Sequence, residues 1–354
     1  MNMSRRDFLK LAATAGVISI APFKMDIMKV FAEAKDYVHI NWLNGAACTG
    51  CSVSFAQSAD PDVIKILTSI TVGNSGLPIA LPDWMYVLHP ASGSLGVELI
   101  NDWINHSGPG KKILIVEGSM QQEGFCETGD KDFREWVKNC AEVTDNIIAF
   151  GSCSAFGGIP HAKGNVTGAM SLQDFLREVG MDDKAEKIIN LSRCPGHPDS
   201  LILTLASLIE GVEPELDSYN RPVAFYGKNI HNEQCPYRPF YDRGIFANFG
   251  QSEQGCRFKL GCKGPVTWTD CPTRRWNDHT AFCIDRGICI GCAEPAWPDG
   301  EFGPFYTELP SLPTVLNIPA ETWGTAFVGA AAAAVAVHAG RKALTKKKEE
   351  KGEE

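Results

Sequence analysis

Thirteen cysteines constrain what this chain can fold into more than any other feature of its sequence. Because the number is odd, disulfides cannot pair every sulfur, and some cysteines must be metal ligands or free thiols. Eleven of them, with one histidine, form three groups of four, and Cys126 and Cys140 are left over. We call these groups the first ligand set (Cys48, Cys51, Cys153 and Cys194), the second ligand set (His231, Cys235, Cys256 and Cys262) and the third ligand set (Cys271, Cys283, Cys289 and Cys292).

Each set has the composition of a metal site. Four thiolates, or three thiolates and one imidazole, can bind either zinc or an iron–sulfur cluster. Cysteines of the first set stand beside Gly50, Gly151 and Pro195-Gly196, and glycine lets backbone N–H groups approach an anionic cluster closely. Zinc has no redox use, so three sets in one chain favour iron–sulfur clusters that carry electrons. An exported binding module held together by disulfides or zinc is the alternative.

Length and composition limit the other possibilities. A chain of 354 residues is long enough for two domains. With 44% hydrophobic and 21% charged residues, wholesale disorder is excluded. The net charge is −9 and no basic run interrupts the middle of the chain, so we expect no nucleic-acid partner.

The segment from 35 to 225 has the pattern of an α/β domain. Apolar runs at 38–43, 112–116 and 147–150 alternate with helical patterns at 132–140 and 172–179. Such alternation predicts a parallel sheet, in which ligands bind beyond the carboxyl ends of the strands. Glu117 directly follows one apolar run, and the sequence leaves open whether it lies near the first ligand set or is a solvated turn carboxylate.

Residues 226–320 have a different texture. They are rich in Gly, Pro, Cys and Trp and show few periodic stretches. We expect metal ligation, in place of a large apolar core, to hold this loop-rich second domain together.

The two ends predict export and membrane attachment. Arg5-Arg6 before a short apolar run is typical of a twin-arginine signal peptide over residues 1–34. Residues 321–354 combine an uncharged stretch, Thr322 to Gly340, with a basic tail, which predicts a transmembrane anchor helix with the body on the extracytoplasmic face. Because many of these residues are alanine, a helix packed on the protein itself is the alternative.

Six ordered motifs identify a family resemblance. They are Cys48-Thr49-Gly50-Cys51, Gly151-Ser152-Cys153, Cys194-Pro195-Gly196, Gly261-Cys262-Lys263-Gly264-Pro265, Arg275-Trp276-Asn277-Asp278 and Ile290-Gly291-Cys292-Ala293-Glu294. With them, residues 35 to 300 resemble the small, electron-transfer subunit of membrane-bound, periplasm-facing [NiFe] hydrogenases.

The resemblance implies a fold, cofactors and partners. It implies a flavodoxin-like domain whose first ligand set holds a proximal [4Fe–4S] cluster, followed by an iron–sulfur domain. There the second set would hold a distal [4Fe–4S] cluster and the third set a medial cluster. The nickel–iron centre would belong to a large partner subunit, so this chain would contain no catalytic residue of its own. Electrons would pass to a b-type cytochrome and a quinone-like acceptor, beside membrane lipids that hold the anchor.

Three departures from the family pattern modify these expectations. Many relatives have proline where this chain has Cys283, and their medial cluster is [3Fe–4S], so the extra thiolate predicts a medial [4Fe–4S] cluster. Gly50 stands where oxygen-tolerant members have an additional cysteine, which predicts ordinary oxygen sensitivity, even though Cys126 falls in the region of a second one. Three residues separate His231 from Cys235 where we expect two, and we expect a flexible loop to absorb the difference.

Two further functions remain compatible with parts of the sequence. The chain could serve hydrogen-dependent reduction of sulfur or polysulfide, since the terminal acceptor is bound elsewhere. A quinone-reductase-like subunit with one cluster would use a related α/β domain, but the second and third ligand sets argue against it.

Overall fold

The computed structural model of the chain describes residues 38–59, 63, 83–108, 110–249, 254–300, 303, 305–309, 314–315, 318–319 and 338. The chain divides into two compact units, Met1–Glu308 and Leu309–Glu354. In the second unit, β8 (Thr314–Val315) pairs antiparallel with β9 (Ile318–Pro319). The predicted export signal at 1–34 lies outside the described residues, and so does the anchor stretch at 322–340 apart from His338. Among the residues that are described, no helix is both long and apolar enough to cross a membrane.

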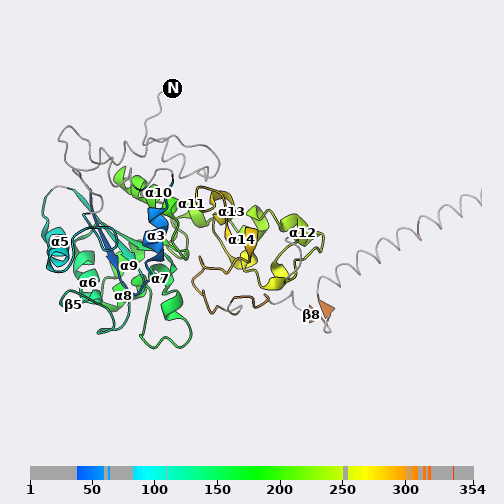
Figure 1. Cartoon of the computed structure of the whole chain (residues 1–354), viewed down its shortest axis with the longest axis horizontal. Coiled ribbons are helices and arrows are strands. Elements are labelled where there is room, and N and C mark those ends of the chain that lie inside the picture. The colour runs from blue at the N-terminus through cyan, green and yellow to red at the C-terminus, as the bar shows by residue number, and fades with distance from the viewer. Residues whose placement is uncertain are drawn as a thin grey trace, which may run out of the picture. The chain divides into compact units, whose positions relative to one another are not determined.

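A five-stranded parallel sheet organises residues 38–225 (Figure 1). In spatial order its strands are β2 (Trp84–Met85), β1 (Val38–Asn44), β3 (Lys111–Glu117), β6 (Asn146–Phe150) and β7 (Ile189–Leu191). Every neighbouring pair is parallel. This order is that of flavodoxin-like sheets, whose ligand sites lie beyond the carboxyl ends of the strands.

Helices cover both faces of the sheet because its strands are apolar on both sides. One face packs on α3 (Gly50–Ala56), α10 (Pro198–Ile209) and α11 (Val223–Tyr226). The other packs on α5 (Ser94–Asn105), α6 (Phe133–Val143), α7 (Ser152–Phe156), α8 (Leu172–Glu178) and α9 (Asp182–Lys187). Figure 1 shows α3 and α10 on the side of the sheet opposite to α6 and α8. Both faces are therefore buried, and functional side chains are left to the loops at the strand ends.

Local signals account for where these helices begin. The side chain of Asp132 accepts the N–H of Arg134 at the start of α6, and that of Ser171 accepts the N–H of Asp174 at the start of α8. Both are N-cap bonds of the kind that Asp and Ser provide. Before α6 lies a small hairpin of β4 (Glu127–Thr128) and β5 (Lys131–Asp132), and after α7 comes η2 (Ile159–His161).

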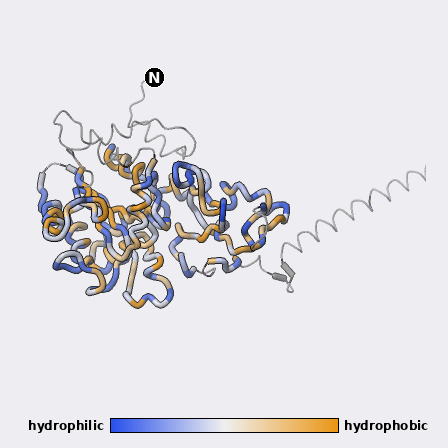
Figure 2. Tube along the Cα trace, in the orientation of Figure 1, coloured by the Kyte–Doolittle hydropathy of each residue, from blue (hydrophilic) through white to orange (hydrophobic). Residues whose placement is uncertain are grey.

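The described part of residues 226–300 consists of short elements and loops. The elements are η3 (Ile230–Gln234), α12 (Arg238–Asp242), η4 (Phe258–Leu260), η5 (Gly264–Val266), α13 (Cys271–Arg274) and α14 (Cys283–Arg286). They surround a small core of Ile230, Cys262, Phe282, Ile284, Ile288 and Cys289. This part belongs to the same compact unit as the sheet, while Figure 2 shows the long hydrophobic stretches gathered within the sheet part.

The predicted parallel α/β fold is confirmed. The three predicted strands are β1, β3 and β6, and the two predicted helices are α6 and α8. We did not predict β2 and β7, because strands of two and three residues are too short to show a periodic pattern. Of these, β7 bears on the site, since Cys194 follows it.

Candidate iron–sulfur sites

The first ligand set lies in the segments that follow the carboxyl ends of three strands. Cys48 and Cys51 follow β1, Cys153 lies in α7 after β6, and Cys194 follows β7. The thiols are close enough to influence one another. Burial raises the pKa of Cys51, and Glu117, Cys153 and Cys194 raise it further. Burial, then Cys153 and Cys48, raise the pKa of Cys194 to about 12. The fold thus gathers all four members of the first set.

Two glycines leave room for these sulfurs. At Gly151, where φ is 91°, a Cβ would lie 2.4 Å from the Cys51 sulfur. At Gly158, where φ is 55°, a Cβ would lie 2.8 Å from the Cys153 sulfur. Neither position can hold a side chain without displacing a thiol. The N–H of Gly196 also donates to the Cys51 sulfur at 3.2 Å, a contact that suits an anionic thiolate.

Glu117 ends β3 and lies beside this set, with 1% of its surface exposed. One of its carboxylate oxygens accepts the N–H groups of Cys51 and Ser52 at 3.1 and 3.2 Å. The other accepts the Ser52 hydroxyl and the Trp42 indole N–H. Burial raises the pKa of Glu117, against the opposing effect of these donors. Of the two interpretations that the sequence left open, the solvated turn carboxylate is wrong.

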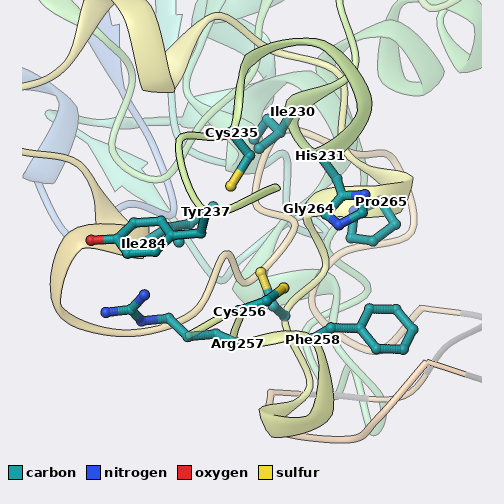
Figure 3. Close-up of a pocket in the computed structure, with 11 residues that line it drawn as sticks. Ile230, His231, Cys235, Tyr237, Cys256, Arg257, Phe258, Gly264, Pro265 and Ile284 are labelled. Carbon is teal, nitrogen blue, oxygen red and sulfur yellow. The ribbon is translucent and has the colours of Figure 1, made fainter. Parts of the chain in front are cut away.

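The second ligand set lines one narrow pocket (Figure 3). Cys235 follows η3, Cys256 forms a backbone bridge with Phe246, and Cys262 follows η4. In Figure 3 the sulfurs of Cys235 and Cys256 point from opposite walls into the space between them. Burial raises the pKa of Cys235 to about 11, and the neighbouring Cys262 and Cys256 thiols contribute.

His231 presents one ring nitrogen in the state that a metal requires. Its Nδ1 lies 3.3 Å from Oδ1 of Asn232 and 3.5 Å from Nη1 of Arg238. With the proton on Nδ1, this nitrogen donates to the amide oxygen and Nε2 keeps a free lone pair. Nε2 is buried and has no hydrogen-bond partner within the described part of the chain. Burial lowers the pKa of His231 and so favours the neutral ring. A neutral imidazole whose second nitrogen is held by a neighbouring group is the usual form of a histidine ligand.

The extra residue between His231 and Cys235 is absorbed differently from the expectation. Residues Ile230–Gln234 form a π-helical turn, η3, which Asn229 caps through a bond from the N–H of Asn232 to its side chain at 3.0 Å. A π-helical turn accommodates one more residue than an α-helical turn. The expected flexible loop is therefore wrong, and a capped helical turn holds His231.

The third ligand set lies on α13, α14 and the loop that follows. Cys271 begins α13, Cys283 begins α14, and Cys289 and Cys292 come after it. Burial raises the pKa of Cys292, and Cys271, Cys283 and Cys194 raise it further. Burial also raises the pKa of Cys289, and the nearby Cys262 and Cys292 thiols raise it further. The four thiols of the third set are thus neighbours, and they also adjoin both other sets.

Direct contacts join the sets at two places. The backbone of Cys194, in the first set, lies close enough to the sulfur of Cys292, in the third, to lower its pKa against the effect of burial. The N–H of Cys289, in the third set, donates to the sulfur of Cys262 in the second at 3.3 Å. The hydroxyls of Ser152 and Ser192 donate to the carbonyls of Cys292 and Ala293 and strengthen the first junction. The third set therefore lies between the other two.

All thirteen cysteines lie within the described residues, and none forms a disulfide. Cys140 is buried in α6, where its sulfur accepts the Asn41 side-chain N–H at 3.4 Å and burial raises its pKa to about 12. Cys126 is half-buried and packs against the same core. Within the described residues, no three His, Cys, Asp or Glu side chains converge as they would around a single metal ion.

One charged group at the site was not among the predicted residues. Arg193 is fully buried and pairs with Asp270. Arg193 directly precedes Cys194, and Asp270 directly precedes Cys271. An ionisable residue next to a predicted ligand was the sequence signal that could have indicated a role at the site. Nothing in a single sequence showed that these two residues, 77 apart, would meet.

Two known families match the two parts of the chain. The family described as the C-terminal region of the NiFe/NiFeSe hydrogenase small subunit matches residues 226–306. The family described as NADH ubiquinone oxidoreductase, 20 Kd subunit, matches residues 48–208.

Similar whole proteins are also known. The periplasmic [NiFeSe] hydrogenase small subunit of Desulfomicrobium baculatum is 36% identical over 329 residues, covering 86% of this chain and 99% of that protein. The F420 non-reducing hydrogenase II small subunit of Methanosarcina mazei is 32% identical, covering 97% of this chain and 94% of that protein. A crystal structure of the reduced, active Ni-Fe-Se hydrogenase of D. baculatum aligns with a TM-score of 0.67 at 35% identity, over 77% of this chain and 99% of that one.

Proposed function

Because the chain belongs to the family of NiFe and NiFeSe hydrogenase small subunits, the non-nickel subunits that pair with a large subunit in these oxidoreductases, we propose that it is the electron-transfer subunit of an uptake hydrogenase. Three [4Fe–4S] clusters, proximal on the first ligand set, medial on the third and distal on the second, would supply the electron carriers between the nickel–iron centre of the large subunit and an external acceptor. The chain's own residues would hold these clusters, exclude water from them and tune their potentials.

One observation carries this proposal: the third set adjoins the first, where the Cys194 backbone lies beside the Cys292 sulfur, and it is hydrogen-bonded to the second through the N–H of Cys289 and the sulfur of Cys262. Isolated structural zinc sites have no need of such contact, whereas electron carriers have to be adjacent. The continuous arrangement of the twelve side chains thus favours electron transfer over a purely structural role.

The donors also fit the clusters that we assign to them. Gly151 and Gly158 leave the space beside Cys51 and Cys153 that a side chain would fill. His231 lines the pocket of the second set, and its buried Nε2 has no hydrogen-bond partner among the described residues. Thiols whose pKa is raised by burial remain protonated at neutral pH without metal, and iron would displace those protons on binding.

We extend the proposal to the two ends of the chain. Residues 1–34 would direct export through the twin-arginine pathway, and residues 321–354 would anchor the protein among membrane lipids. A b-type cytochrome would receive the electrons at the membrane and pass them to a quinone-like acceptor. The sequence motifs support this, as does the similarity to a relative named as periplasmic.

The test is the metal content of the complex. The full chain, purified without air together with its large subunit, is expected to be brown and to contain about twelve irons on this subunit. Zinc in place of iron, or a colourless protein with disulfides, would overturn the proposal.

The role of Cys283 has its own test. Replacing it by proline is expected to lower the iron content by about one atom per chain, since a three-iron cluster needs only three protein ligands. Low-temperature EPR of the oxidised complex should then show a new signal from the third set. An unchanged spectrum and iron content would remove Cys283 from the ligand set.

A further inference from the structure

A fully buried cation lies between the first and third ligand sets. Arg193 has 0% of its side chain exposed and forms an ion pair with Asp270. Its guanidinium stacks on the ring of Tyr226, 5.2 Å from the ring centroid. Asp270 in turn accepts the Nε–H of Arg274 at 2.7 Å. The guanidinium is therefore fixed in position on several sides.

Each guanidinium nitrogen of Arg193 donates to a defined acceptor. Nη2 donates to Asp270, Nη1 donates to the Ser200 hydroxyl at 3.3 Å, and Nε donates to the Thr269 hydroxyl at 2.8 Å. Of these acceptors, Thr269 connects the guanidinium to a predicted ligand, because its Oγ1 lies 3.6 Å from the sulfur of Cys271. Cys271 belongs to the third ligand set.

The direction of this last hydrogen bond follows from chemistry. A cysteine bound to iron is a thiolate and has no proton to donate. The Thr269 oxygen already accepts the Nε–H of Arg193, so its own hydroxyl proton is available for the Cys271 sulfur. A donor that itself accepts from a cation is polarised and donates more strongly.

Thr267 offers a natural contrast in the same stretch of chain. Its Oγ1 lies 3.7 Å from the sulfur of Cys289, another member of the third set. However, its hydroxyl donates to the carbonyl of Lys263 at 2.6 Å, and a hydroxyl has one proton. Both threonines are buried beside a third-set sulfur, but only Thr269 is arranged to donate to one.

We infer that Arg193 is a positioning residue that acts through Thr269 to raise the reduction potential of the cluster on the third ligand set. The inference rests on the proposed function, because it assumes an iron–sulfur cluster at that set. Hydrogen bonds to cluster sulfurs and nearby positive charge stabilise the reduced, more negative state, and so raise the potential. The chain Arg193–Thr269–Cys271 combines both effects at one ligand.

The test is the midpoint potential of each cluster in the anaerobically purified complex, measured by EPR-monitored redox titration. Thr269→Val is expected to shift the potential of the third-set cluster to more negative values and to leave the other two in place. The matched control, Thr267→Val, is expected to shift it much less. The Cys283→Pro variant identifies which signal belongs to the third set, because the spectrum of that set alone should change.

Arg193→Lys tests whether the arginine acts through the threonine. It keeps the positive charge but removes the planar fork, so a smaller negative shift is expected. In the double variant Arg193→Lys/Thr269→Val, the potential should equal that of Thr269→Val alone. Shifts that add, or equal shifts for Thr267→Val and Thr269→Val, would overturn the inference.

Assembly is checked separately by the iron content. Thr269→Ser keeps the hydroxyl and is expected to retain the wild-type potential, so a shift as large as that of valine would contradict the inference. If Thr269→Val fails to bind iron at the third set, the inference is tested with Arg193→Lys instead. An unchanged potential of the third-set cluster in Arg193→Lys would then reject the inference. A wild-type complex with far fewer than about twelve irons would instead reject the proposed function.

Discussion

The sheet part, residues 38–225, and the cysteine-rich part, residues 226–300, are stabilised in different ways. The sheet part buries two large apolar clusters, one on each face of its five strands. The cysteine-rich part has one cluster of six buried residues, and two of the six, Cys262 and Cys289, are predicted ligands. Short helical turns replace long elements there. The comparison indicates that the first part can fold through apolar burial alone, while the second depends on its ligands.

The difference also appears at the ligands themselves. In the sheet part, the first set follows the ends of strands, and no member of the set belongs to the buried apolar core, although Cys51 packs against it. In the cysteine-rich part, the sulfurs of Cys262 and Cys289 are themselves core atoms. Binding of a metal to such residues contributes directly to folding free energy. We therefore expect iron loss to have unequal consequences in the two parts.

Replacing Cys262 by serine should have the largest effect on iron binding and on the stability of the cysteine-rich part. Cys262 is 6% exposed, and its sulfur accepts the Cys289 N–H, which joins the second and third sets. We expect the variant to lose the second-set iron and, with it, protection of residues 226–300 against hydrogen exchange, while the strands of the sheet stay protected. Iron content and hydrogen exchange resolved by region measure both effects.

Cys140→Ser is the matched control for that experiment. Cys140 is also a buried cysteine whose sulfur accepts an N–H bond, from Asn41 at 3.4 Å, but it lies in the apolar core of the sheet part. Its replacement is expected to cost about 1–3 kcal/mol of stability and to leave the iron content unchanged. Equal loss of iron in both variants would contradict the division between the two parts.

The junction of the two parts should be sensitive to acid through His197. This residue caps α10, where its Nδ1 accepts the N–H of Asp199 at 3.2 Å, while its Nε2–H donates to the carbonyl of Arg275 in the cysteine-rich part. Burial, then the charge of Arg193, lowers the pKa of His197 from 6.5 to about 3. Below pH 6.5 the unfolded chain therefore binds a proton that the folded chain does not.

Stability should accordingly fall by about 1.4 kcal/mol for each pH unit below 6.5, until the pH approaches the folded pKa. His197→Asn keeps an N-cap side chain but has no proton to bind, so its stability should fall less steeply. Chemical unfolding of both proteins at pH 7, 6 and 5 gives the two slopes. Parallel slopes would show that His197 is not the group responsible.

Much of the sheet part could be predicted from the sequence. The strands β1, β3 and β6 are long apolar runs, and their alternation with helices indicated the parallel fold. The cysteines at their ends could then be assigned to one edge. β7 was too short to detect, but the motif at Cys194 led us to group it with Cys48, Cys51 and Cys153, and, after burial, the Cys153 and Cys48 thiols do raise its pKa.

The rest could not be predicted because it depends on contacts between distant residues. The π-helical turn around His231 has no sequence signature that separates it from a loop. The burial of Arg193 depends on Asp270, Ser200 and Thr269, which come from segments on both sides of the junction. Glu117 was uncertain for the same reason, since its donors lie 65 and more residues earlier in the chain.

A smaller effect is expected from substitutions inside the sheet part. There, iron binding by the first set should be lost without unfolding of the sheet. Gly151→Ala places a Cβ 2.4 Å from the Cys51 sulfur, at a φ of 91° that disfavours any side chain. Gly164→Ala imposes comparable backbone strain, with φ of 106°, but nothing lies within 4 Å of the new Cβ. Each variant should lose about 1–3 kcal/mol from strain.

Only Gly151→Ala is expected to lose first-set iron, because only there does the new methyl group occupy the space beside a ligand. Iron analysis and thermal unfolding of the two variants separate crowding of the sulfur from strain of the backbone. If both variants kept all their iron, the space beside Cys51 would not be needed for a cluster. If both lost it, the first set would depend on the stability of the sheet as a whole, and the independence that distinguishes this part from residues 226–300 would not hold.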